Sequence, residues 1–84
     1  MDWFVYIVKC ADESLYTGIT TNTDRRTWEH NNSKLGAKSL KGKLPVKLIY
    51  KERYENKFEA AKREREIKGW RREKKLELIS EKIN

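Results

Sequence analysis

Two tyrosines, one arginine and one histidine near the start of the chain have types and spacing suited to chemistry on a phosphate. Tyr6 lies in a short apolar run and Tyr16 begins the segment Tyr16-Thr17-Gly18-Ile19. Arg26 follows, and then His30, the chain's one histidine. A planar guanidinium can bind two phosphate oxygens, and tyrosine and histidine can exchange protons with a reacting group. With a carboxylate added, the set would suit phosphodiester cleavage.

Glu64 is the carboxylate that the sequence places nearest to this set. In a helix, Ala60, Glu64 and Ile67 share one narrow stripe, and the apolar pair should face the sheet. A carboxylate on an inward stripe must be paired, hydrogen-bonded or bound to a metal. Helix geometry alone slightly favours an ion pair with an arginine over a metal site. Glu64 could nevertheless hold Mg²⁺ (or Mn²⁺), because magnesium often takes one or two carboxylates.

The tyrosines must share a sheet face to act together. Residues 3–10 and 15–20 are rich in β-branched and aromatic side chains and predict an antiparallel hairpin. Side chains alternate between the two faces of a strand, so Tyr6 and Tyr16 share a face only if the loop has an odd number of residues. We also expect nearby arginine, histidine and metal to lower a tyrosine pKa from its usual value of about 10.

The remaining elements complete a small α+β fold. Capping residues predict a helix from Asn22 or Thr23 to Asn31 or Asn32, with Arg26 and His30 on one face. Trp28 should point into the core. Residues 33–45 show no periodicity, residues 46–51 predict a third strand that could extend to residue 54, and two more helices follow at 57–68 and 71–83.

Those last helices have recognisable boundaries. Asn56 and Glu59 resemble a capping box, and Gly69 suits a helix stop. The final helix carries Leu76, Ile79 and Ile83 on one stripe. We therefore expect one domain over residues 1–84, with helices packed on a three-stranded antiparallel sheet in the order β-β-α-β-α-α.

Composition narrows the classes of protein. The 84 residues carry a net charge of +7, which favours polyanions such as nucleic acid without requiring them. One cysteine and one histidine exclude an internal disulfide and a Cys/His zinc finger. No run is long enough for a signal peptide or a membrane span, so we expect a cytoplasmic protein with no membrane partner.

Two basic segments are candidate nucleic-acid contacts, although solvated surface charge is the commoner explanation for each. The first is the loop at 33–45, which could clamp a phosphate backbone, and the second is the start of the last helix. The residues concerned are Lys34, Lys38, Lys41, Lys43, Arg71 and Arg72.

Taken in order, these blocks resemble the GIY-YIG nuclease superfamily, and in particular its small standalone bacterial proteins. Phe4-Val5-Tyr6 stands at the first tripeptide and Tyr16-Thr17-Gly18 at the second. Phe4 replaces a glycine, Thr17 replaces an isoleucine, and Ser39-Leu40 departs from an expected aromatic-threonine pair. The resemblance runs from about residue 3 to 79 and includes Arg26, His30, Gly36-Ala37-Lys38, Pro45, Leu48-Ile49-Tyr50, Glu59-Ala60, Arg63-Glu64, Ile67-Lys68-Gly69-Trp70 and Lys74-Lys75.

The resemblance implies a divalent-metal-dependent DNA endonuclease, which we expect to be weak or structure-selective. Tyr6 would be the general base or would orient the water, and Tyr16 would support it or be the alternate base. Arg26 would stabilise the phosphate, His30 would assist the tyrosine or the phosphate, and Glu64 would hold the metal. Two alternatives stay open: a non-catalytic nucleic-acid-binding module, and an accessory subunit to which a protein partner delivers substrate.

Overall fold

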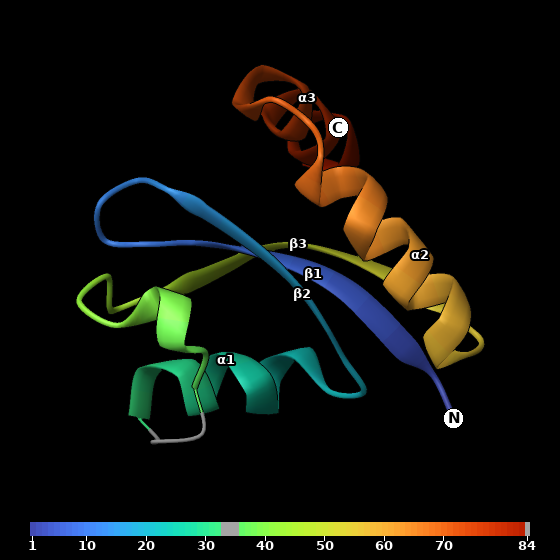
Figure 1. The fold of residues 1–84 in the computed structure, drawn as a ribbon, viewed down its shortest axis with the longest axis horizontal. Coiled ribbons are helices and arrows are strands. Elements are labelled where there is room, and N and C mark those ends of the chain that lie inside the picture. The colour runs from blue at the N-terminus through green and yellow to red at the C-terminus, as the bar shows by residue number, and fades with distance from the viewer. Residues whose placement is uncertain (33–35, 84) are drawn as a thin grey trace.

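The computed structural model describes residues 1–32 and 36–83, except for the side chains of residues 82 and 83. Three antiparallel strands, β1 (Trp3–Lys9), β2 (Leu15–Thr20) and β3 (Lys47–Tyr54), form a sheet in the order β2-β1-β3. The helices are α1 (Thr23–Asn32), the short 3₁₀ helix η1 (Lys38–Leu40), α2 (Lys57–Lys68) and α3 (Arg72–Ile83). The predicted α+β class and element order are confirmed (Figure 1).

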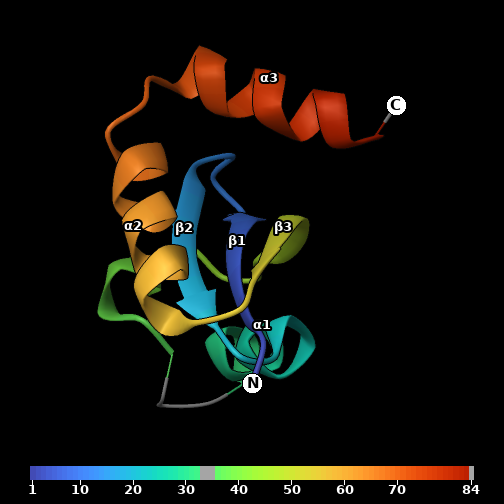
Figure 2. The ribbon, with the colours of Figure 1, turned by 90° about the vertical axis from the view of Figure 1, so that its right-hand side faces the viewer.

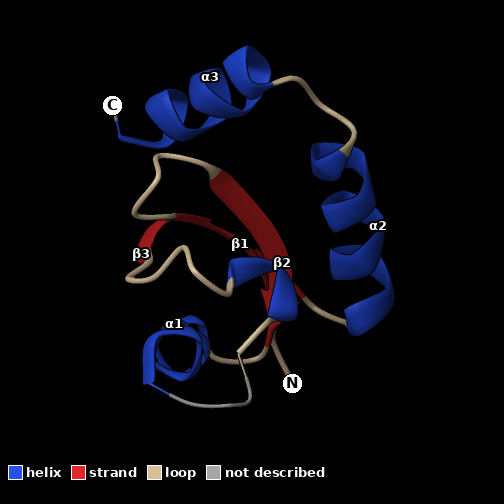
Figure 3. Cartoon of the chain, turned by 60° about the vertical axis from the view of Figure 1, so that its left-hand side comes forward, coloured by secondary structure: helices blue, strands red, loops and turns tan. Residues whose placement is uncertain are grey.

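The helices lie on both sides of the sheet. Figures 1 and 3 show α1 and α3 on opposite sides, and Figure 2 shows α2 running alongside β2. Two helices begin where the sequence predicts, because an asparagine caps each. The Asn22 Oδ1 accepts the Arg25 backbone N–H at 2.9 Å, and the Asn56 Oδ1 accepts that of Glu59 at 2.9 Å.

Strand β1 is buried on both faces, so the sheet separates two apolar clusters. The cluster under α2 and α3 contains Val5, Ile7, Tyr50, Ala60, Ile67 and Ile79. The cluster on the side of α1 and η1 contains Tyr6, Val8, Cys10, Leu40 and Val46. Central strands bury both faces in this way, and alternation along one strand supplies both clusters. Tyr6 therefore belongs to the second side, whereas α2 packs against the first.

Two sequence predictions need correction. Trp28 is 60% exposed and is not a core residue, because the buried positions of α1 are Thr23 and His30. Leu76 is 42% exposed, because α3 turns Ile79 and Leu78 toward the core instead. The segment 33–45 shows no periodicity, but its described part contains η1, whose Leu40 is buried in the second cluster together with Val46.

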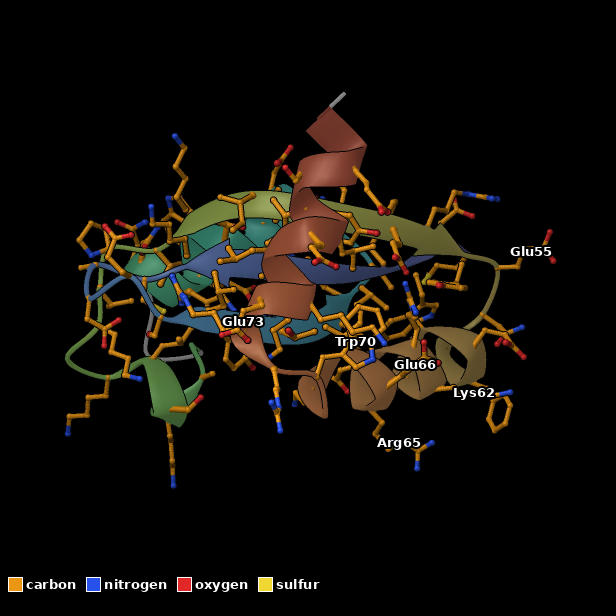
Figure 4. All side chains as sticks on the ribbon, turned by 90° about the horizontal axis from the view of Figure 1, so that it is seen from above. Glu55, Lys62, Arg65, Glu66, Trp70 and Glu73 are labelled. Carbon is orange, nitrogen blue, oxygen red and sulfur yellow. The ribbon has the colours of Figure 1, made fainter. Side chains whose placement is uncertain are left out.

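A polar cluster that the sequence does not reveal joins β3 to α2. Glu52 accepts hydrogen bonds from both tyrosine hydroxyls on its strand, Tyr50 and, at 2.7 Å, Tyr54. The Arg63 guanidinium donates to the same carboxylate from α2 at 3.0 and 3.1 Å. Arg63 also lies 5.0 Å from the ring centroid of Trp70. Figure 4 shows Trp70 at the end of α2, whereas Arg65 points away from the sheet.

Replacing Thr17 with valine should stabilise the fold. Thr17 is 3% exposed, and its hydroxyl has no hydrogen-bond partner within the described part of the chain. Burying an unpaired hydroxyl is unfavourable, so Thr17→Val should raise the free energy of unfolding by about 1 kcal/mol in urea titrations. Thr20→Val is the matched control: Thr20 is equally buried, but its hydroxyl accepts the Asn22 backbone N–H at 3.2 Å, so stability should fall. A loss of stability in Thr17→Val would contradict the assignment.

Replacing Glu52 with glutamine should destabilise the protein in a pH-dependent way. Burial raises the pKa of Glu52, but hydrogen bonds from Arg63, Tyr50 and Tyr54 outweigh it and leave the pKa below its usual 4.5. A depressed carboxyl pKa stabilises the fold above the unfolded-state pKa, and that contribution disappears as the pH falls through the folded-state pKa. Glu52→Gln should therefore lose about 2 kcal/mol at neutral pH. The difference from wild type should narrow below pH 4.5, and a difference independent of pH would contradict this account.

Candidate active site

The hairpin register places both tyrosines on the side of α1. Tyr6 pairs with Gly18 and Val8 pairs with Tyr16, so Tyr6 and Tyr16 lie on one face, two positions apart. The connection between the paired residues Lys9 and Leu15 comprises residues 10–14, which is an odd number. The ring centroids of the two tyrosines are 6.3 Å apart. The predicted shared face is confirmed.

Gly18 leaves the space that the Tyr6 ring occupies. A Cβ placed on Gly18 would come within 2.7 Å of the Tyr6 hydroxyl oxygen and 2.8 Å of Cζ, which is closer than atoms can approach. The phenol therefore lies across β2 at the one position of that strand without a side chain. The ring is 1% exposed, and its hydroxyl is directed toward α1 and His30.

Helix α1 brings Arg26 and His30 to the tyrosines. The His30 Nε2 lies 2.8 Å from the Tyr6 Oη, and the rings of His30 and Tyr16 have centroids 5.5 Å apart. The other ring nitrogen of His30, Nδ1, accepts the backbone N–H of Ala37 at 3.3 Å. His30 is 2% exposed, and burial together with the positive charge of Arg26 lowers its pKa. The imidazole is therefore neutral at pH 7.

Arg26 is held between Tyr6 and an acidic neighbour. Its Nη1–H donates to the Glu29 Oε1 at 2.9 Å, three residues along the helix. Its side chain is 25% exposed, so part of it is open to solvent. Arg26 also donates a hydrogen bond to the Tyr6 hydroxyl. The arginine expected to bind phosphate thus lies beside the tyrosine expected to do chemistry.

The pKa of Tyr6 is raised, which corrects the expectation that its neighbours lower it. Burial raises the pKa most, Tyr16 adds to the increase, and the charge and hydrogen bond of Arg26 oppose it. The carboxylate of Glu64 raises the pKa further. Burial dominates because a phenolate loses the favourable hydration that it has in water. Arg26 acts in the expected direction, but it does not outweigh burial.

Glu64 occupies the predicted stripe of α2. Ala60 and Ile67 are fully buried on either side of it along the helix, and the Glu64 side chain is 19% exposed. Its ion pair is with Lys68, at 3.4 Å, rather than with an arginine. The Lys68 side chain is 51% exposed and can move away. Its negative charge contributes less to the raised pKa of Tyr6 than burial or Tyr16 does.

The residues present fit a magnesium ion for which water and substrate provide most of the ligands. Among the described residues, no three histidine, cysteine, aspartate or glutamate side chains gather at one place. Mg²⁺ does not need such a group, since one carboxylate with phosphate oxygens and waters can complete its shell. A partly exposed Glu64 with a displaceable lysine partner meets that requirement.

The predicted nucleic-acid contacts are divided between the two sides of the sheet. Lys38 and Lys41 are exposed and line a cavity of about 340 Å³ together with His30, Leu40 and Leu44. Lys43 faces Asp12 at 3.8 Å, and Lys34 lies outside the described residues. The exposed Arg71 and Arg72 stand where α3 begins, on the side away from α1 (Figure 3).

Sequence reasoning missed three groups that shape the site. Glu29 was not considered as a partner of Arg26, although three-residue spacing on a helix is a signal for such a pair. Asn31 exchanges two hydrogen bonds with the backbone of Val46, at 2.7 and 3.0 Å, and so ties the end of α1 to the start of β3. The backbone N–H of Ala37 could not have been found, because it carries no side-chain signal.

No helix within the described ranges is long and apolar enough to cross a membrane. A family model described as the GIY-YIG catalytic domain matches residues 2–77. UPF0213 proteins from Staphylococcus aureus strains Mu3 and Mu50 are 54% identical over 79 residues, covering 94% of this chain and 95% of theirs. The solution NMR structure of a UPF0213 protein from Bacillus halodurans is 42% identical, with a TM-score of 0.61, and the match covers 95% of this chain and 84% of that one. The chain therefore belongs to the GIY-YIG catalytic domain family and to its small UPF0213 members.

Proposed function

We propose that the protein is a divalent-metal-dependent endonuclease that hydrolyses phosphodiester bonds in DNA, with weak or structure-selective activity. The observation that carries the proposal is the hydrogen-bonded pair of Tyr6 and His30, with Arg26 beside it. Tyr6 comes from β1, and Arg26 and His30 come from α1. Membership of the GIY-YIG catalytic domain family supports the same reaction class.

Each side chain has a role that follows from its surroundings. Arg26 exchanges its contact with Glu29 for two oxygens of the phosphate and stabilises the charge that develops on them. Tyr6, in its ionised form, accepts the proton of the attacking water as the water oxygen bonds to phosphorus and the bond to the leaving oxygen breaks. Tyr16 packs beside Tyr6 and keeps its ring in place. His30 holds the Tyr6 hydroxyl.

Glu64 would hold Mg²⁺ or Mn²⁺, and a bound ion supplies positive charge that stabilises the phosphate and the leaving oxygen. Lys68 must give up its ion pair with Glu64 when this carboxylate is used. On the substrate side, Lys38 and Lys41 provide positive charge next to His30 and are our candidates for contacts with neighbouring phosphates. Arg71 and Arg72, at the start of α3, would contact DNA only if the DNA wrapped around the sheet.

Removing any of three side chains should abolish most cleavage. Plasmid, single-stranded and branched DNA would be incubated with the purified protein and Mg²⁺ or Mn²⁺. Tyr6→Phe, Arg26→Ala and Glu64→Ala should each lower the nicking rate by about 100-fold or more, the usual loss when a base or a charge-stabilising group is removed. Arg25→Ala and Glu59→Ala are matched controls, because they remove an arginine from α1 and a glutamate from α2 at exposed positions. Both variants should retain activity.

Other outcomes of this experiment would separate the alternatives. Cleavage that survives all three substitutions would show that the site is wrong. Metal-independent binding without cleavage by the wild-type protein would favour a non-catalytic nucleic-acid-binding module. Cleavage that appears only after a partner protein is added would favour an accessory subunit.

The raised pKa of Tyr6 predicts a rate that increases with pH. A general base acts in its deprotonated form, and a pKa above the usual 10.0 leaves that form scarce at neutral pH. The cleavage rate should therefore rise about tenfold for each pH unit between pH 7 and 9, without levelling off. The profile would be measured under single-turnover conditions at constant metal concentration. A level profile over this range would mean that neutral Tyr6 orients the water instead of taking its proton.

A further inference from the structure

The two ring nitrogens of His30 face different kinds of partner. Nδ1 lies 3.3 Å from the backbone nitrogen of Ala37, and Nε2 lies 2.8 Å from the Tyr6 hydroxyl oxygen. A backbone N–H can only donate, so Nδ1 must be the nitrogen without a proton. A neutral imidazole carries a single proton, which must then be on Nε2. A tyrosine hydroxyl can accept or donate, so it adapts to either arrangement.

We propose that the backbone N–H of Ala37 is a positioning group that holds His30 in its Nε2–H tautomer and so makes His30 a hydrogen-bond donor to Tyr6. The catalytic significance of this rests on the proposed nuclease function, but the tautomer itself does not. Nothing about the side chains alone would assign the proton, because an isolated imidazole can place it on either nitrogen.

The segment that carries Ala37 is held firmly against α1. A Cβ on Gly36 would lie 3.0 Å from the Cα of His30, so the absence of a side chain lets the loop approach the helix. Downstream, the Leu40 backbone N–H donates to the Ala37 carbonyl at 3.1 Å. The Leu40 side chain is 3% exposed within the cluster that also contains Tyr6. The same packed cluster thus holds the loop, the backbone N–H of Ala37 and the Tyr6 ring in place.

A donor at Nε2 defines what His30 can do. It cannot take the Tyr6 proton, because the nitrogen that faces Tyr6 already carries one. Together with Arg26 it directs two donors at the same phenol oxygen, an arrangement that favours the ionised form of a tyrosine. His30 therefore stabilises the phenolate that the reaction needs, and its own protonation state stays the same throughout.

The tautomer can be measured without any substrate. His30 is the chain's one histidine, so a ¹⁵N spectrum of histidine-labelled protein contains two ring resonances that belong to it alone. Nδ1 should show the shift of an unprotonated ring nitrogen and Nε2 that of a protonated one. The reverse assignment in the wild-type protein would overturn the proposal.

Ala37→Pro removes the donor and keeps the backbone shape. Ala37 has φ −65°, the value that proline adopts, and the preceding Gly36 tolerates proline better than other residues would. The variant should show mixed tautomers and cleave about three- to tenfold more slowly, the effect of one net hydrogen bond. Ala37→Ser keeps the N–H and is the matched control, with both ring resonances of His30 unchanged. An unaltered tautomer in folded Ala37→Pro would overturn the proposal.

A second pair of variants tests the donor role even if Ala37→Pro does not fold. A glutamine side chain can donate to Tyr6 but cannot act as a base, so His30→Gln should keep at least tenfold more activity than His30→Ala. Equal activities of these two variants would overturn the donor role. If the wild-type protein cleaves nothing but shows the Nε2–H tautomer, the proposed function fails and the assignment of His30 as a donor stands.

Discussion

The close approach of the Tyr6 phenol to Gly18 is the constraint on which the site depends. The ring reaches His30 only because the paired position on β2 has no side chain, and any Cβ there would collide with the hydroxyl. The second tripeptide, Tyr16-Thr17-Gly18, therefore contributes an empty volume at Gly18 as well as a ring that packs beside Tyr6. The same pairing sets Tyr16 beside Tyr6, so one register determines both positions.

The two sides of the sheet differ in the kinds of residue that they bury. The side under α2 contains most of the aliphatic packing and the Glu52–Arg63 pair that ties β3 to α2. The side under α1 contains Tyr6 and His30, enclosed by a smaller apolar cluster, whereas Glu64 is on α2. Because β1 supplies alternate residues to both, Tyr6 stands between the fully buried Val5 and Ile7 and cannot shift along the strand without disturbing the main core. This rigidity suits a reacting group that needs fixed geometry.

Sequence reasoning reached the side chains that follow from periodicity. Alternation placed the tyrosines on one face, helical spacing placed Arg26 with His30, and the stripe through Ala60 and Ile67 located Glu64. It failed where tertiary contacts decide. Trp28 is exposed because α1 turns its polar residues inward, which reverses the usual preference. The contact of Ala37 with His30 depends on a loop path that no periodic pattern encodes. The Tyr6 pKa likewise follows from the depth of burial, which residue types alone do not give.

The contact between Arg26 and Glu29 has a consequence for how the protein would meet a polyanion. An exposed arginine that binds a phosphate contributes to affinity partly by setting free ions condensed on the nucleic acid. Arg26 already has an internal counter-ion, the Glu29 carboxylate at 2.9 Å, and a phosphate would displace that group from it. This exchange would offset part of the electrostatic gain, so Arg26 would contribute more to discrimination between anions than to overall affinity. Long-range attraction to the polyanion would come from the exposed lysines. The salt dependence of the binding affinity would therefore reflect the number of lysine–phosphate contacts rather than the contact of Arg26.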